Sequence, residues 1–93
     1  MMENNLRLVA ENEARVSITY KGEIGDLPDP VSYEAGEADV KQWVTEALRG
    51  GGVPGVPRDE HADLTDFVVE RFRANEARPV NVIIIRPKTP FGL

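Results

Sequence analysis

The chain of 93 residues contains no cysteine. This absence excludes disulfides, thiolate zinc sites, iron–sulfur clusters and cysteine nucleophiles. A small domain without such covalent or metal links must be stabilised by packing alone. The length allows one hydrophobic core, so residues 1–93 are expected to form a single domain, with flexible ends at residues 1–5 and 88–93.

Side chains that serve in catalysis are also scarce. His61 is the only histidine, and the only serines are Ser17 and Ser32. Both serines lie in expected strands, and neither is part of a strand-to-helix nucleophile motif. The sequence therefore does not favour an enzyme, and we expect a non-catalytic protein without a cofactor.

Long apolar segments are missing as well. The longest apolar run spans residues 82–85, whereas a membrane helix needs about 20 apolar residues. The first eight residues, MMENNLRL, carry an acid and amides where a signal peptide has positive charge and an apolar stretch. The expectation is a cytoplasmic protein with no membrane partner.

The charge is negative overall but unevenly distributed. A net charge of −5 argues against a nucleic-acid partner. Residues 1–40 hold nine acids and three bases, whereas residues 71–93 hold five bases and one acid. Two interpretations of the bases at the C-terminal end are open. They are solvated side chains at the ends of secondary-structure elements, or they belong to a bipolar surface that orients a partner or a second copy.

Hydrophobic periodicity predicts three strands in this chain. Alternation over residues 16–21 indicates a half-buried strand, and residues 31–34 are expected to pair antiparallel with it. Two glycines, two prolines and two aspartates in residues 21–30 predict a loop between them. Residues 80–86 form the third strand, whose apolar run predicts a central place in the sheet before Pro87 and Pro90 end it.

Two helices are expected between the second and third strands. Residues 37–49 carry an apolar stripe that includes Trp43, which is predicted to lie in the core. Gly50 is expected to adopt the left-handed backbone conformation that ends this helix. A second helix is predicted from Asp59 to about residue 74, with Asp59 as its cap. Its expected buried face comprises Leu64, Phe67, Val68 and Phe72.

These elements predict an α+β fold with a small mixed β-sheet. The order is strand, strand, helix, helix, strand (β-β-α-α-β), with both helices on one face and the last strand beside the first. From the hairpin at 15–34 through the helix at 37–49, this order resembles the β-grasp folds of the ubiquitin-like superfamily. The fold is therefore expected to be β-grasp-like.

The resemblance implies an alternative function, that of a ubiquitin-like modifier or carrier acting through its C-terminal tail. The tail PKTPFGL departs from the family because it lacks the terminal Gly-Gly used for activation. Removal of Leu93 would expose Gly92 as a terminal glycine. The second helix expected at 59–74 is a further departure, since that family usually has short strands and turns there.

The glycines at 50, 52 and 55 match the spacing of a dinucleotide-binding fingerprint. That fingerprint follows a strand and opens a helix, whereas these glycines follow a helix and Pro54 lacks an N–H group. We interpret them as a helix end and a loop. A second alternative remains, in which the 50–61 loop binds a small ligand or metal with His61 and nearby acids, although acids at a helix start are already explained by capping.

The leading hypothesis is a small acidic protein-interaction module or accessory subunit without catalytic activity. It rests mainly on exclusion, and the expected partner is another protein or a second copy in a homodimer. An exposed strand edge at 31–34 is the main positive feature, because such an edge can pair with a partner strand. The residues expected to serve interaction are Val31 and Tyr33 at this edge, Arg71, Arg86 and Lys88 at the basic end, and Gly92 in the tail.

Overall fold

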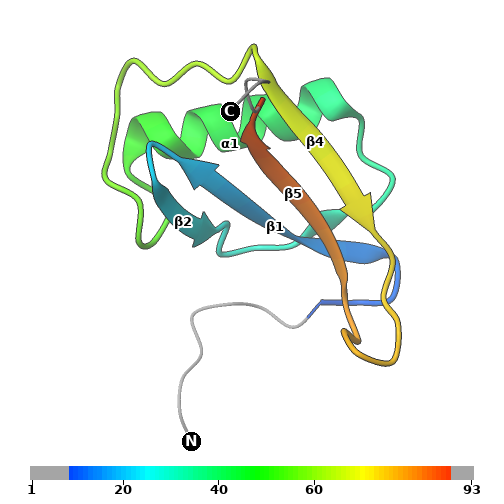
Figure 1. Cartoon of the computed structure of the whole chain (residues 1–93). Helices are drawn as coiled ribbons and strands as arrows, with labels where there is room; N and C mark the ends of the chain where they lie inside the picture. Colours follow the sequence, from blue (N-terminus) through cyan, green and yellow to red (C-terminus); the bar gives the residue numbers. More distant parts are fainter. Residues whose placement is uncertain (1–8, 89–93) are drawn as a thin grey trace, which may run out of the picture.

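The computed structural model describes residues 9–88 as two layers, a mixed five-stranded sheet and one helix. Figure 1 shows the helix lying across one face of the sheet. The elements in chain order are β1 (Glu13–Tyr20), β2 (Glu23–Asp26), β3 (Val31–Ser32), α1 (Glu37–Gly50), β4 (Phe67–Phe72) and β5 (Asn81–Pro87).

The sheet has the strand order β2-β1-β5-β4, and β3 also pairs with β1. β2 and β3 run antiparallel to β1, β5 runs parallel to β1, and β4 runs antiparallel to β5. The predicted strand at 80–86 is confirmed, with its central position beside the first strand (Figure 1).

The core lies between α1 and the face of the sheet that it covers. Every second residue of β1 is buried there, because successive strand side chains point to opposite faces. α1 contributes three buried side chains spaced four residues apart. The fully buried side chains of these elements are Ala14, Val16, Ile18, Val40, Val44, Leu48, Ile83 and Ile85.

The second predicted helix is wrong, and with it the two-helix β-β-α-α-β order. Residues 59–66 form turns, and residues 67–72 form β4. Asp59 Oδ1 and Asp63 Oδ1 each accept the backbone N–H two residues on, a contact that closes a turn instead of capping a helix. β4 then alternates, since Phe67 and Val69 pack on the core while Val68 points to the other face.

The predicted loop at 21–30 is also partly wrong, because it contains β2. Lys21 and Gly22 have positive φ angles of 51° and 82° and form a two-residue turn between β1 and β2. Gly25 of β2 lies so close to the 53–56 loop that an added Cβ would be 2.5 Å from the Pro54 carbonyl oxygen. The antiparallel strand expected at 31–34 is present as the shorter β3.

The helix expected at 37–49 is confirmed, although its end and one side chain differ from the prediction. α1 includes Gly50, and Gly51, with φ of 76°, is the left-handed residue that follows it. Trp43 was expected in the core but is 41% exposed. The reason is that the buried stripe is narrow, running along Val40, Val44 and Leu48, so Trp43 lies at its flank.

Candidate functional site

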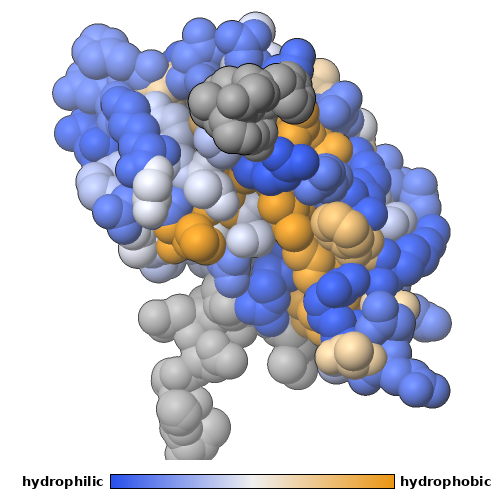
Figure 2. All heavy atoms as spheres, viewed as in Figure 1, coloured by the Kyte–Doolittle hydropathy of each residue, from blue (hydrophilic) through white to orange (hydrophobic). Residues whose placement is uncertain are grey.

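The candidate site is the face of the sheet opposite α1, which we call the outer face. Figure 1 shows α1 behind the sheet, and Figure 2, from the same direction, shows apolar side chains gathered over β4 and β5. The strand registers place Val82 next to Arg15 and Phe72, and Ile84 next to Ser17 and Glu70. The outer face comprises Glu13, Arg15, Ser17, Thr19, Ile24, Asp26, Val68, Glu70, Phe72, Val82, Ile84 and Arg86.

Large apolar side chains of the outer face are accessible to solvent. Ile24 is 70% exposed and Phe72 is 39% exposed, and Val68, Val82 and Ile84 are half-buried. Phe72, Val82 and Ile84 lie together over β4 and β5, whereas Ile24 lies apart from them at the β2 edge, beside Thr19. Exposed apolar side chains that gather on one face mark interaction surfaces more often than isolated ones do. The outer face therefore has the composition of a binding surface.

Two ion pairs lie among these apolar side chains. Arg86 donates to both carboxylate oxygens of Glu70 over 3.1 and 2.9 Å, a two-point contact that holds both side chains in place. This hydrogen bonding lowers the pKa of Glu70 from its ordinary value and raises that of Arg86. Arg15 and Asp26 form a longer pair at 3.9 Å. The outer face thus combines apolar groups with charges of fixed position.

Arg71 and Tyr33, both expected to serve interaction, are brought together by the fold itself. The Arg71 guanidinium donates to the carbonyl of Tyr33 over 2.7 Å and to that of Ala35. The Arg73 guanidinium lies 4.3 Å from the centre of the Tyr33 ring, a cation–π distance. These contacts fasten the segment between β3 and α1 to β4, which gives both residues a structural role.

The other expected interaction residues are separated from this cluster. Val31 lies at the β3 edge, half-buried against the core and paired with Ala14. Arg86 lies toward the other end of the sheet, on the outer face, and Lys88 is exposed directly after β5. Gly92 lies outside the described residues. Among the described residues, the structure therefore does not gather the predicted ones into one site.

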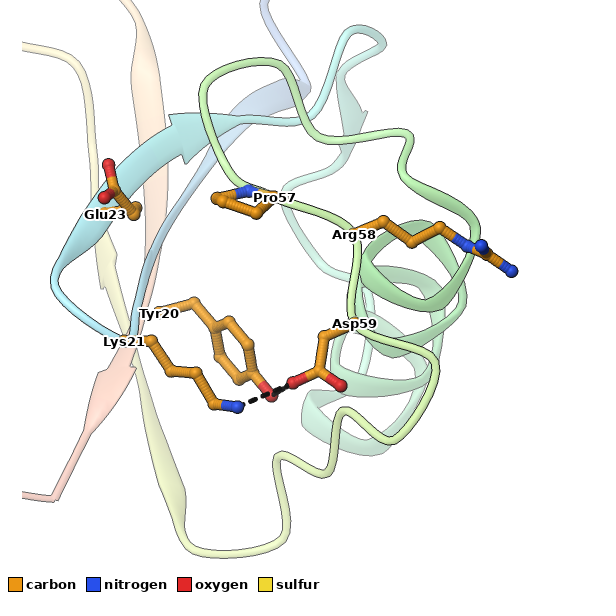
Figure 3. A pocket seen from close by; sticks show the side chains of 6 residues that line it. All are labelled: Tyr20, Lys21, Glu23, Pro57, Arg58 and Asp59. Carbon is orange, nitrogen blue, oxygen red and sulfur yellow. Dashed lines mark hydrogen bonds and ion pairs between the residues drawn. The ribbon is translucent and has the colours of Figure 1, made fainter.

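A hollow of about 400 Å³ lies between the β1–β2 turn and the loop after α1, as Figure 3 shows. The Tyr20 hydroxyl and Lys21 Nζ both donate to Asp59 Oδ2, over 2.7 and 2.9 Å. The hydrogen bond from Lys21 and, to a smaller extent, the one from Tyr20 hold the pKa of the Asp59 carboxyl far below its usual range. The pKa of Tyr20 is raised mainly by burial and, to a smaller extent, by its hydrogen bond to Asp59. Tyr20, Lys21, Glu23, Pro57, Arg58 and Asp59 line the hollow.

The polar groups of this hollow have a clear structural role. Asp59 joins the loop to the hairpin, and its backbone N–H donates to the carbonyl of Leu48 over 2.9 Å. Arg58 points away from the hollow in Figure 3, and its Nε donates to the carbonyl of Arg49 over 3.0 Å. Within residues 9–88, no group of three or more histidine, aspartate or glutamate side chains is arranged to hold a metal ion.

The glycine motif has a structural explanation as well. Gly52 donates its N–H to the carbonyl of Ala47 over 2.7 Å, which continues the helix end begun at Gly51. Val53 and Val56 are buried, so the loop contributes to the core. This arrangement agrees with the interpretation of the motif as a helix end and loop.

Sequence reasoning missed the outer face because its members were assigned to other elements. Phe72 was placed on a buried helical face, and Ile24 was placed in a loop. Val82 and Ile84 were expected in a central strand because the run at 82–85 is uninterrupted, and an exposed side of this strand was not predicted. The available signal was alternation, since every second residue of that run must point away from α1.

None of the helices in the described part of the chain has the length and apolar character needed to cross a membrane. Comparisons of the chain with protein-family models, with curated proteins and with solved structures found no match.

Proposed function

We propose that this protein is a non-catalytic protein-interaction module that binds its partner through the outer face. The observation that carries the proposal is the exposure of Ile24 and Phe72 on the face opposite α1. Burying an apolar side chain of this size from full exposure contributes roughly 1.5–3 kcal/mol, so covering the exposed parts of Ile24 and Phe72 contributes a fraction of that for each. A few such side chains supply most of the binding energy in a typical interface.

The chemistry next to Phe72 supports the same function. The Arg78 guanidinium lies 5.5 Å from the centre of the Phe72 ring. Aromatic and arginine side chains are enriched in the energetic centres of interfaces. The Arg86–Glu70 pair is already formed on the same face, so binding loses little side-chain freedom there.

A comparative pull-down tests this proposal. Tagged wild-type protein and a Phe72→Ser variant are used as bait in extracts of the source cells, and the captured proteins are quantified by mass spectrometry. We expect the variant to capture at least tenfold less of a specific partner other than the chain itself. Trp43→Ser is the matched control, because Trp43 is as exposed as Phe72 but lies on α1.

Equal capture by wild type and Phe72→Ser would contradict binding through the outer face. Turnover of a substrate that a single polar substitution abolishes would contradict the non-catalytic function. Circular dichroism of both variants verifies that the comparison is between folded proteins.

A second candidate function is a modifier or carrier that acts through the tail after Leu93 is removed. It is supported by the arrangement of a β1–β2 hairpin, a helix and a final strand parallel to β1, which the ubiquitin-like resemblance implies. The test is the intact mass of N-terminally tagged protein from native cells. Loss of Leu93 with higher-mass covalent adducts is the expected result, and a mass that retains Leu93 without adducts would contradict it.

A further inference from the structure

We propose that the partner of the outer face binds as an extended strand that adds to the free edge of β4. The inference rests on the proposed function, because it names the form of the partner at the same surface. β4 is the border of the outer face on this side and contributes Val68, Glu70 and Phe72 to it. A strand added beside β4 therefore continues both the sheet and the outer face.

Of the strands at the sheet edges in the described chain, β4 is the longest. It is the last strand of the order β2-β1-β5-β4, and Figure 1 shows it at one margin of the sheet. β4 is six residues long, whereas β2 and β3, which share the opposite edge, are four and two residues long. Its pairing with β5 runs without interruption over residues 67–72, which contain no proline and no lysine. Proline, lysine and bulges are common protections of an exposed edge, and β4 lacks all three.

The pairing of β4 with β5 indicates which backbone groups face the free edge. In an antiparallel pair, residues that hydrogen-bond to the neighbouring strand alternate with residues whose N–H and C=O point away from it. Phe67 is of the second kind, because its N–H donates to the carbonyl of Leu64 over 3.0 Å and its partner Pro87 has no N–H. Alternation then directs the backbone N–H and C=O of Val69 and Arg71 to the free edge. In the described chain, no backbone group outside the strands bonds to them.

The side chains of β4 do not oppose an added strand. Its two charged side chains are held by groups of the same chain. Arg86 binds Glu70 on the outer face, and the carbonyls of Tyr33 and Ala35 accept from Arg71 on the other face. The remaining side chains of β4 are apolar. A partner strand therefore meets no unpaired charge on β4.

The outer-face row of β4 defines which partner side chains fit. An antiparallel strand places its residues i, i+2 and i+4 opposite Phe72, Glu70 and Val68. Apolar β-branched or aromatic residues suit positions i and i+4. A neutral polar residue suits i+2, because Arg86 already binds both oxygens of Glu70 and an acid there would be repelled. The ligand class is an extended peptide segment of the form apolar-x-polar-x-apolar.

β4 of a second copy fits this edge less well. The longest antiparallel registers of β4 with itself that match face to face set Glu70 opposite Val68 or opposite the Glu70 of the other copy. Like charges directly opposite each other are destabilising, and an apolar side chain gains little from a charged one. The edge therefore favours a segment of another protein.

Amide exchange of the free protein tests the orientation of the edge. We expect the amides of Val69 and Arg71 to exchange at least tenfold faster than those of Val68, Glu70 and Phe72, whose N–H groups face β5. Equal protection along β4 would overturn the inference, because the edge would then be occupied already. Protection of Val69 and Arg71 that grows with protein concentration alone would identify a second copy as the occupant and would also overturn it.

A synthetic peptide tests the ligand class on the wild-type chain. The probe is Lys-Val-Thr-Thr-Thr-Val-Lys with blocked ends, whose valines are spaced to meet Phe72 and Val68. At saturation we expect it to slow the exchange of Val69 and Arg71 at least tenfold. Replacing the central threonine with glutamate should raise the dissociation constant at least threefold, because this residue lies opposite Glu70.

Two methylated forms of the probe separate strand addition from other binding. Methylation of the backbone nitrogens of the third and fifth residues removes the N–H groups that face Val69 and Arg71, so the dissociation constant should rise at least tenfold. Methylation at the second and sixth residues changes N–H groups that face away from β4 and should leave binding unchanged. Equal binding of the two methylated peptides, or no binding of the parent peptide, would overturn the inference.

Val69→Pro tests the natural partner in the pull-down of the proposed function. The variant removes an N–H that faces the free edge, where proline is tolerated, and it keeps the outer-face side chains. Val69→Ala is the matched control, because it loses the core packing of the same side chain but keeps the N–H. We expect Val69→Pro to capture at least tenfold less of the partner that Phe72→Ser loses, and Val69→Ala to capture as much as wild type. Circular dichroism verifies that both variants are folded.

The outcomes separate the two proposals. Normal capture by Val69→Pro together with loss by Phe72→Ser would overturn strand addition and leave the proposed function standing. Normal capture by both variants would contradict both proposals. The peptide measurement uses the wild-type chain, so it decides on strand addition even if Val69→Pro is unfolded.

Discussion

At the scale of single residues, Asp59 carries the clearest electrostatic signature in the described chain. Its carboxylate accepts hydrogen bonds from Lys21 and Tyr20, and both stabilise the charged form. The folded protein therefore binds this proton less tightly than the unfolded chain does. The resulting stability is present above the unfolded pKa, about 3.9, and is lost as the pH falls through the lower folded-state pKa.

We predict that Asp59→Asn lowers the free energy of unfolding most at neutral pH. The difference from wild type should shrink as the pH falls below about 4, where the unfolded carboxyl becomes protonated. Urea unfolding from pH 7 to pH 2 measures this dependence. Asp29→Asn is the control, since Asp29 is exposed. A difference that stays constant over this pH range would contradict the assignment of the Asp59 charge to these bonds.

Tyr20→Phe removes the other half of the same link. The variant loses one hydrogen bond to a carboxylate from a side chain that is 6% exposed, so we predict a loss of about 1 kcal/mol in unfolding free energy. Ultraviolet titration of wild type should contain a phenol that ionises above its ordinary pKa, and the variant should lack it. A variant that retains the high-pH component would show that it does not come from Tyr20.

At the scale of elements, local pattern predicted α1, β5 and most of β1, but it failed for β4. The spacing of Leu64, Phe67, Val68 and Phe72 fits one face of a helix, yet Phe67 and Val69 also fit one face of a strand. The choice is made by β5, whose residues 82–87 pair with residues 67–72. Although only residues 73–80 separate the two strands, a pairing between two segments leaves no trace in the spacing of residues within either one.

β2 was missed for a similar reason. Its residues lie in a segment rich in glycine and proline, which is typical of loops. The structure instead uses Gly25 as the point where β2 approaches the 53–56 loop, because the Pro54 carbonyl leaves no room for a side chain. The outer face depends on both β2 and β4, so it could not be assembled from sequence while these strands were unknown.

Gly25→Ala tests the role of this approach. The new Cβ would lie 2.5 Å from the Pro54 oxygen and 2.9 Å from methyl groups of Val53 and Val56. Since backbone and buried side chains must shift, we predict a loss of about 1–3 kcal/mol in urea unfolding. Gly50→Ala is the matched control. It meets no atom within 4 Å and should be neutral or stabilising. Equal stability of the two variants would contradict close packing at β2.

At the scale of the whole molecule, stability is expected to be highest where β1 meets β5. These strands are central, and residues 14–18 pair with residues 81–85. Their inward side chains Val16, Ile18, Ile83 and Ile85 are fully buried. Regions with dense apolar packing and protected hydrogen bonds open only with global unfolding, whereas loops open locally. The loop at 57–66 has no strand or helix of its own.

Native-state hydrogen exchange should resolve these two classes of amides. For amides of residues 14–18 and 81–85, we predict that the opening free energy from exchange equals the free energy of global unfolding measured with urea. For amides of residues 57–66, we predict a much lower opening free energy. Tyr20→Phe should speed the amide exchange of residues 57–61 by more than its effect on global stability explains, because it weakens the link between the Asp59 loop and the hairpin. Tyr33→Phe is the control, because the hydrogen bonds of Tyr33 to Asn12 and Arg71 use its backbone N–H and carbonyl. If residues 57–61 and the central strands slow or accelerate together in every variant, the loop unfolds only with the sheet. The Asp59 contacts would then stabilise the whole fold and would not act as a local fastening.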